Sequence, residues 1–294
     1  MRIAILTRLP SYYSEQRLSE EGKKRGHDVA LIQYPKCYIN LDSGEPEVRY
    51  EGRALNQIDA IIPRLTAGSV SYGAAIARQL EVMGVYTTAS SIAISRAFDR
   101  LRSLQVLSRS GVEIPKTVFS RETEQWDDLL SHFKLPVVIR PATTTRGSGP
   151  VQAETAKAAI ALMRVLSNNT AFMIQERVGE DSMDTVAMVV GKTVVASLQY
   201  DSIAKQPTSG TKALPVKLTP EENKIVLRAA TALGVSICSV QFIRSALGTY
   251  VIGVDATPSL EIFEKAAKRN VAEKIIEYIE LNAKRRNKKD RIGA

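Results

Sequence analysis

Short apolar runs alternate with helix-length amphipathic segments from the first residues of the chain onward. Residues 3–6 form an apolar run of strand length, and residues 14–24 have the spacing of an amphipathic helix. Gly26 ends this helix, and residues 29–32 supply the next apolar run. A strand, a helix and a second strand in this order predict two parallel strands joined by a helical crossover.

The same alternation continues to about residue 111. The segments that carry it are predicted strands at 58–64 and 85–87 and predicted helices at 72–83 and 92–108. Gly111 and Pro115 then interrupt the pattern and indicate a domain boundary near residue 112. A chain of 294 residues is long enough for two or three subdomains.

The second half is organised differently, because strands there follow one another through short connections. Gly191 and Lys192 form a tight turn between two of them, which predicts antiparallel pairing. We expect strands over residues 135–140, 171–176, 185–190, 193–200, 238–243 and 250–254, and helices over residues 155–166, 220–233 and from about 260 onward. The predicted fold class is α/β, with an α+β arrangement in the C-terminal half.

Composition excludes several other classes of protein. Hydrophobic residues make up 44% and charged residues 24% of the chain, as in ordinary globular proteins. No apolar run reaches the roughly 18 residues of a membrane helix, and no secretory leader pattern is visible, so we expect a cytoplasmic protein without membrane contact. Two cysteines (Cys37, Cys238) and two histidines (His27, His132) disfavour disulfide, zinc and Ser-His-Asp chemistry.

A loop of small residues follows the predicted strand at 135–140. Its sequence is Thr143-Thr144-Thr145-Arg146-Gly147-Ser148-Gly149. Glycines and hydroxyls let backbone N–H groups approach phosphate oxygens, and the arginine adds positive charge. The loop does not match the P-loop pattern, however, and an ordinary flexible hairpin explains it equally well.

Polar residues at the ends of other strands give this loop a context. Arg140 ends the strand before the loop, Gln175 and Glu176 end another strand, and Asp255 follows the strand at 250–254. A cation, a small-residue loop, a polar hinge and a carboxylate are the groups needed to hold a nucleotide between two sheets. We therefore predict a nucleotide site in the second half of the chain.

The order and spacing of these pieces resemble the ATP-grasp ligases, and within them the RimK-like family that adds glutamate to the C-terminus of a ribosomal small-subunit protein. The resemblance covers almost the whole chain. It is sharpest over Ile61-Ile62-Pro63-Arg64, Tyr72-Gly73, Gln79-Leu80-Glu81-Val82-Met83-Gly84, Ala93-Ile94-Ser95-Arg96-Ala97-Phe98-Asp99-Arg100-Leu101-Arg102-Ser103 and Gly111-Val112-Glu113-Ile114-Pro115. It implies an ATP-grasp fold with an N-terminal α/β domain over residues 1–111, a central lid over 112–177, a C-terminal domain over 178–283 and a basic tail over 284–294.

The resemblance also implies a reaction and a binding site. An acceptor carboxylate, on a protein C-terminus or a small acid, takes the γ-phosphate of ATP to give an acyl phosphate, and an amine then displaces phosphate to form an amide. Magnesium ions neutralise phosphate charge in such reactions. The implied nucleotide-binding residues are Arg100, Arg140, Thr145, Arg146, Gly147, Ser148, Gly149, Gln175, Glu176 and Asp184.

Several positions depart from what the resemblance implies. Arg100 and Arg140 stand where lysines are expected, and Gln241 and Gly253 stand where metal-binding carboxylates are expected. Asp255 stands where an asparagine is typical and could still bind a metal. Because proteins hold magnesium chiefly through carboxylates, we predict ATP binding with weakened magnesium binding.

Two functions are therefore alternatives. The first is an active ATP-dependent carboxylate–amine ligase, favoured by the extent of the resemblance. The second is a catalytically impaired relative that keeps the cleft for nucleotide binding or regulation, favoured by the neutral residues at positions 241 and 253. The sequence leaves the catalytic residues, the donor amino acid and a homo-oligomeric state open.

Positive charge is concentrated at the C-terminus. The chain carries a net charge of +9, of which residues 284–291, with six basic side chains and one acid, contribute +5. Such a tail can bind RNA or the ribosome, and it can equally be a solvated helix end.

We predict that deleting residues 284–294 abolishes binding to RNA and leaves the melting temperature nearly unchanged, because a solvated terminal segment buries little area. Fluorescence anisotropy with a labelled RNA at several salt concentrations measures the binding, and the intact chain should show a steep loss of affinity with salt. Survival of RNA binding after the deletion would place the site on the body of the protein. A clear loss of thermal stability would show that the tail packs on that body.

Overall fold

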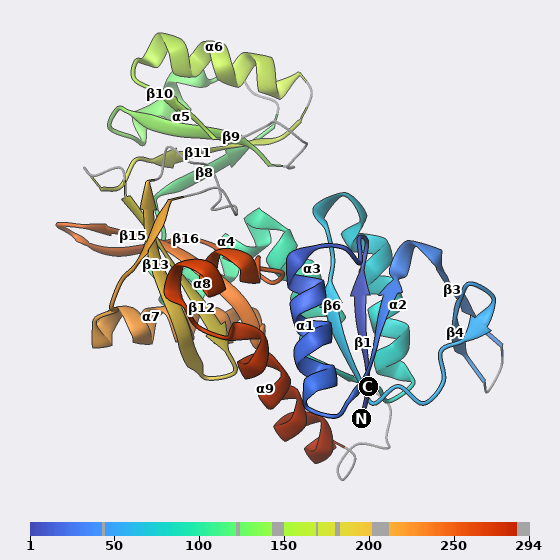
Figure 1. Ribbon diagram of the computed structural model, residues 1–294. Coiled ribbons are helices and arrows are strands. Elements are labelled where there is room, and N and C mark those ends of the chain that lie inside the picture. The colour runs from blue at the N-terminus through green and yellow to red at the C-terminus, as the bar shows by residue number, and fades with distance from the viewer. Residues whose placement is uncertain are drawn as a thin grey trace.

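The structure, a computed structural model, describes residues 1–42, 45–121, 124–142, 150–168, 170–179, 183–201 and 212–286. An N-terminal sheet and a C-terminal sheet lie side by side, and a smaller central sheet stands at one end of the C-terminal sheet (Figure 1). Within the described ranges no helix combines the length and the apolar character needed to span a membrane.

The N-terminal sheet is parallel, as predicted from the alternation of strands and helices. Its strand order is β2-β1-β6-β7, and each neighbouring pair runs parallel. Its strands are β1 (Arg2–Thr7), β2 (Asp28–Gln33), β6 (Ala60–Arg64) and β7 (Tyr86–Thr87), and its helices are α1 (Tyr13–Lys24), α2 (Val70–Val82) and α3 (Ser91–Phe98). β1 is buried at every position after Arg2, as expected for an inner strand of a sheet that is covered on both faces.

A small antiparallel sheet extends from the side of this domain (Figure 1). Its strands are β3 (Cys37–Asn40), β4 (Glu47–Tyr50) and β5 (Arg53–Ala54), and two short 3-10 helices, η1 (Tyr34–Lys36) and η2 (Ala67–Ser69), lie nearby in the chain. The sequence did not predict this sheet, because its strands are short and carry charged residues.

The helix predicted over residues 92–108 is in fact two helices. α3 ends at Phe98, and α4 (Arg100–Arg109) begins two residues later. Between them Asp99 has an extended backbone, and its carboxylate accepts a hydrogen bond of 3.0 Å from the backbone N–H of Arg102. An aspartate favours this capping position over a helix interior, which explains why the single-helix prediction is wrong. The break makes Arg100 the first residue of a helix.

The central sheet is antiparallel and has a core of its own. Its strand order is β10-β9-β11-β8, and α5 and α6 pack on it. The elements are β8 (Thr117–Ser120), α5 (Trp126–Ser131), β9 (Val137–Pro141), β10 (Val151–Ala153), α6 (Ala156–Ser167) and β11 (Phe172–Glu176). Ile139, Met163 and Phe172 are fully buried in this core, which joins neither of the larger cores of the protein.

The C-terminal sheet has the predicted antiparallel pairing, in the order β14-β13-β12-β15-β16. Its elements are β12 (Met183–Val190), β13 (Thr193–Asp201), β14 (Ala213–Pro215), α7 (Pro220–Leu233), β15 (Ile237–Ser245), β16 (Gly248–Asp255), α8 (Leu260–Ala267) and α9 (Val271–Arg286). The single final helix predicted from residue 260 is wrong, because Lys268 adopts a left-handed conformation that ends α8. The backbone of α9 continues into the first residues of the predicted basic tail.

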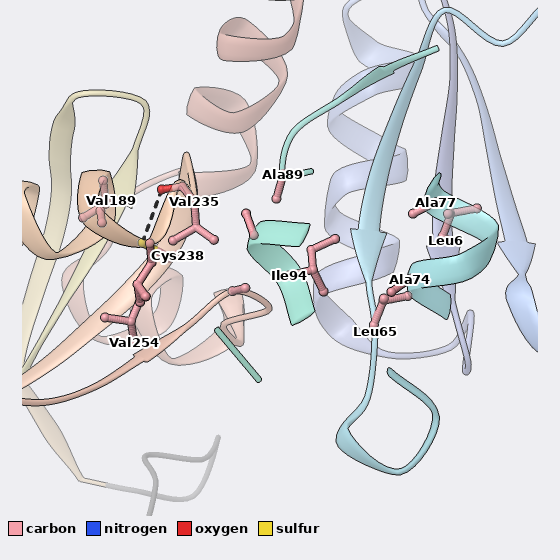
Figure 2. Close-up of a cluster of buried hydrophobic side chains, with 14 of the residues drawn as sticks. Leu6, Leu65, Ala74, Ala77, Ala89, Ile94, Val189, Val235, Cys238 and Val254 are labelled. Carbon is pink, nitrogen blue, oxygen red and sulfur yellow. Dashed lines mark hydrogen bonds between the residues drawn. The ribbon is translucent and has the colours of Figure 1, made fainter. Parts of the chain in front are cut away.

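Two hydrophobic cores join the N-terminal sheet to the C-terminal sheet. One core runs from Leu6 through Ile94 of α3 to Val235 and Cys238, as Figure 2 shows. The other places α9 against both β1 and the C-terminal sheet, since Ile275 belongs to the same buried cluster as Ile3 and Met188. We call the N-terminal and C-terminal sheets, together with the helices that pack on them, the frame. The predicted domain limits at residues 111 and 177 stay predictions.

A charged cluster ties the end of α1 to α9. The guanidinium of Arg25 donates to both carboxylate oxygens of Glu280, at 3.1 and 2.7 Å, and the ring of His27 lies 2.7 Å from the same carboxylate. These hydrogen bonds, that of Arg25 first, lower the pKa of Glu280 from its ordinary value to about 2.

The pKa of Glu280 yields a prediction about acid stability. A carboxyl with a lowered pKa in the folded state stabilises the protein at neutral pH, and this contribution is lost as the pH falls from about 4.5 through about 2. We expect Glu280→Gln to reduce the free energy of unfolding by about 1 kcal/mol at pH 7, since the pair is partly exposed. Urea unfolding at a series of pH values should show the difference from the parent shrinking over this acid range.

Glu51→Gln is the matched control, because Glu51 pairs with Lys36 where both side chains are more than half exposed. Its effect should stay within about 0.5 kcal/mol. Equal effects of the two substitutions would contradict the assigned role of Glu280.

Candidate functional site

The predicted site residues come from separate elements that meet between the central sheet and the frame. Arg140 lies on β9 of the central sheet, and Arg100 begins α4. Asp184 lies near the start of β12, at the end of the C-terminal sheet above which the central sheet stands (Figure 1). The charge of Arg140 contributes to the lowered pKa of Arg100, and the carboxylate of Asp184 acts on Arg140 in the opposite direction. Contacts through Gly253 and Gln241 place Arg100 and Asp184 on the same part of the C-terminal sheet, and Arg140 is linked to both by charge.

Arg100 is half-buried, and its guanidinium contacts the backbone of β16. Its Nη2 donates to the carbonyl oxygen of Ile252 at 2.8 Å, and its Nε has no hydrogen-bond partner among the described residues. Burial is the main cause that lowers the pKa of Arg100 to about 9, and the charge of Arg140 acts in the same direction. The group is still a cation at neutral pH.

Arg140 lies opposite Met173 of the neighbouring strand β11. Its Nε is also buried without a partner in the described part of the chain. Burial lowers the pKa of Arg140 to about 10, and the carboxylate of Asp184 opposes this shift. We call Arg100 and Arg140 the arginine pair.

Asp184 is held by two neutral side chains. The amide nitrogen of Gln241 donates to Asp184 Oδ2 at 2.7 Å and also donates to the hydroxyl of Tyr200. Burial raises the pKa of the Asp184 carboxyl, and the hydrogen bonds from Gln241 and Tyr200 oppose the rise. Burial, followed by the charge of Asp184, raises the pKa of Tyr200. The three side chains form one buried polar network.

Tyr200 was missed in the sequence analysis for an identifiable reason. Counting back from the turn at Gly191 and Lys192 would place Asp184 opposite Gln199. An irregularity between Met188 and Val189 shifts the register by one residue, so Asp184 faces Tyr200 instead. No sequence signal marks this bulge.

The residues at the expected metal positions do not fit magnesium. Gln241 and Gly253 face each other across β15 and β16, and neither offers a carboxylate. Asp255 Oδ1 accepts hydrogen bonds from the backbone N–H of Thr257 at 2.8 Å and from its hydroxyl at 3.3 Å, so it stabilises the turn before α8. Across the described ranges, no group of three acidic, histidine or cysteine side chains is placed to hold a metal.

Gln175 and Glu176 connect the central sheet to the segment that enters it. Gln175 Nε2 donates to Thr117 Oγ1 at 2.9 Å, and Glu176 Oε1 accepts from the backbone N–H of Lys116 at 2.7 Å. Their predicted contact with a nucleotide stays a prediction. Five further predicted residues, Thr145, Arg146, Gly147, Ser148 and Gly149, lie outside the described residues.

Two family models match the chain, and together they cover nearly all of it. The model described as the RimK PreATP-grasp domain matches residues 1–94, and the model described as the RimK-like ATP-grasp domain matches residues 97–279.

Curated relatives match over the full length. A protein named probable alpha-L-glutamate ligase 2, from Pseudoalteromonas atlantica, is 41% identical over 298 residues and covers 99% of each chain. A probable alpha-L-glutamate ligase from a Picosynechococcus species is 42% identical over 301 residues, again with 99% of each chain covered.

A solved structure shares the whole fold. The ATP-grasp ligase PsnB, complexed with a minimal precursor, Mg and ADP, matches with a TM-score of 0.76 at 15% identity and covers 96% of this chain and 98% of its own. The predicted ATP-grasp fold is confirmed.

The polar network at Asp184 yields a prediction about stability. Tyr200→Phe removes the hydroxyl that contacts Gln241 and Asp184, and it should lower the free energy of unfolding by about 1–2 kcal/mol, because buried polar atoms lose a partner. Urea unfolding measures the change. Tyr12→Phe, at a half-exposed position, is the control and should stay within about 0.5 kcal/mol. A neutral Tyr200→Phe would show that the hydroxyl does not support the network.

Proposed function

Because this chain belongs to the RimK-like ATP-grasp family, we propose that it is an ATP-dependent carboxylate–amine ligase that joins glutamate to an acceptor carboxylate. The observation that carries the proposal is the pair of family matches, which leave only residues 95–96 and 280–294 unmatched. The full-length relatives named as glutamate ligases support glutamate as the amino acid that is added.

The proposed reaction has two steps. An oxygen of the acceptor carboxylate attacks the γ-phosphorus of ATP, the bond to ADP breaks, and an acyl phosphate forms. The amine of glutamate then attacks the acyl carbon, phosphate leaves, and the amine loses a proton as the amide forms. Positive groups that face the phosphates stabilise the charge that moves during the first step.

We assign the phosphates to the region between β9 and the C-terminal sheet, which we call the proposed cleft. Arg100 and Arg140 lie here as half-buried side chains, and each has a buried Nε donor that no described residue accepts. A triphosphate offers many acceptor oxygens and a high negative charge, which complement such donors. Asp184, Gln175 and Glu176 stay in the proposed site as predicted nucleotide neighbours, with the side chains of the last two bonded within the central sheet.

We expect this chain to bind magnesium weakly. The PsnB structure contains Mg and ADP, which supports ATP as the nucleotide here. Gln241 and Gly253 supply no carboxylate in this chain, and Asp255 is engaged in a turn. We therefore propose weakened magnesium binding and assign no step of the reaction to the metal.

The acceptor is proposed from chemistry and from the structural relatives. Solved neighbours are complexed with precursor peptides, which supports a peptide or protein C-terminus, and a small carboxylic acid meets the same chemical requirement. Contact of the basic tail with the ribosome or RNA, a cytoplasmic location and a homo-oligomeric state stay predictions. The alternative of a non-catalytic relative gains no support from the comparisons, since the matched proteins are named as ligases.

A coupled assay tests the proposal. We expect ADP to form only when ATP, L-glutamate and a peptide with a C-terminal glutamate are all present, and mass spectrometry should show the peptide lengthened by glutamate. Arg140→Ala should weaken ATP binding about tenfold or more, because a charge-assisted contact to phosphate is lost. Arg164→Ala, on the exposed face of α6, is the control and should leave affinity unchanged. ATP hydrolysis without a lengthened peptide, or no nucleotide binding at all, would contradict the proposal.

A further inference from the structure

We propose that the arginine pair takes the place of the divalent cation in this cleft, so that the site binds the metal-free form of a nucleoside polyphosphate in preference to its magnesium complex. This inference rests on the proposed function for the identity of the ligand. It concerns which species of the nucleotide the cleft accepts, and it follows from where the two guanidinium groups lie.

Arg100 lies beside the strand position that lacks a side chain. Its Nη1 is 3.9 Å from the point where a Cβ atom on Gly253 would stand, and its Nη2 is bonded to the neighbouring carbonyl of Ile252 at 2.8 Å. The glycine leaves the space beside β16 open to the guanidinium. A cationic side chain therefore reaches the place where the family resemblance leads us to expect a metal-binding carboxylate.

The charges support the same interpretation. Carboxylates at positions 241 and 253 would add two negative charges, and the neutral Gln241 and Gly253 leave the cleft more positive by that amount. A single magnesium ion carries the same two positive charges. With the carboxylates absent and the arginine pair present, the cleft offers fixed positive charge without a metal.

Each member of the arginine pair has a donor atom without a hydrogen-bond acceptor among the described residues. Within the described part of the chain, both Nε atoms are buried without an acceptor, and the one opposite charge that acts on the pair is the carboxylate of Asp184, on Arg140. A buried donor without an acceptor is costly, and the positive charge of Arg140 further disfavours the charged form of Arg100. A ligand with several anionic oxygens removes both costs, because each guanidinium can donate two hydrogen bonds to it.

Magnesium should then compete with the protein. The ion covers phosphate oxygens and cancels two of the negative charges that the arginine pair would meet. In an ordinary metal-dependent cleft, the carboxylates attract this ion, and the complex binds better than the free nucleotide. In this cleft no described cluster attracts it, so the complex should bind less well.

Calorimetric titration with ADP tests the inference. We expect binding in EDTA to be at least tenfold tighter than binding in excess magnesium chloride. Tighter binding with magnesium than in EDTA would overturn the inference and leave the proposed function standing. Absence of ADP and ATP binding under both conditions would overturn the inference and the proposed function together.

A single carboxylate placed beside Arg100 gives a second test. Gly253→Glu should pair with the guanidinium and weaken ADP binding in EDTA about tenfold, since one of the two cations is neutralised. Thr249→Glu is the matched control, because it adds the same charge on the same strand about 13 Å before Gly253. Thermal unfolding of both variants confirms that they are folded. Unchanged affinity in a folded Gly253→Glu would overturn the assignment of Arg100.

A variant that restores the carboxylates gives a third test. The combined variant Arg100→Lys, Gln241→Asp, Gly253→Glu and Asp255→Asn exchanges the long cation for a shorter one and restores acidic groups on β15 and β16. We expect its ADP binding to become at least tenfold tighter with magnesium than in EDTA, the reverse of the parent. If this variant is folded and keeps the preference of the parent, residues 100, 241, 253 and 255 do not set the metal dependence.

Discussion

Burial of apolar surface between the N-terminal sheet and the C-terminal sheet is the constraint on which the rest of the structure depends. Ile94 of α3 and Ile275 of α9 belong to the two cores that join these sheets, and residues from both halves of the chain bury one another there. Apolar burial on this scale is the dominant favourable contribution to folding. It fixes α4, β15 and β16 relative to one another, and with them the positions of Arg100, Gln241 and Gly253.

The site carries positive side chains and lacks the carboxylates that the family resemblance implies. Arginines lie on α4 and β9, while the positions of β15 and β16 where the resemblance implies acids carry an amide and a glycine. The remaining acids accept hydrogen bonds from neighbouring residues: Asp184 from Gln241, and Asp255 from Thr257 in the turn before α8. This arrangement of charge is the basis on which we propose that the site binds anions more readily than cations.

Much of the fold was predictable from local patterns. The parallel strands β1, β2 and β6 each contain a short apolar run, and the turn at Gly191 and Lys192 defines the hairpin of β12 and β13, so both were found in the sequence. The breaks at Asp99 and Lys268 were missed, because the periodicity of the flanking helices continues across them. Resemblance identified Arg100, Arg140 and Asp184, and the structure brings them together. It could not reveal Tyr200, which depends on a bulge in the hairpin.

The two members of the arginine pair belong to different bodies of the protein. Arg100 is part of the frame, whereas Arg140 stands on the central sheet, whose core is separate. Like charges repel, so Arg140 and Arg100 disfavour each other's approach, whereas the carboxylate of Asp184 attracts Arg140 toward the C-terminal sheet. An anion that contacts both arginines attracts both, and it thereby favours the approach of the central sheet to the frame. If the arginine pair binds the proposed ligand, the approach of the central sheet to the frame should depend on ionic strength, because salt screens both the repulsion and the attraction.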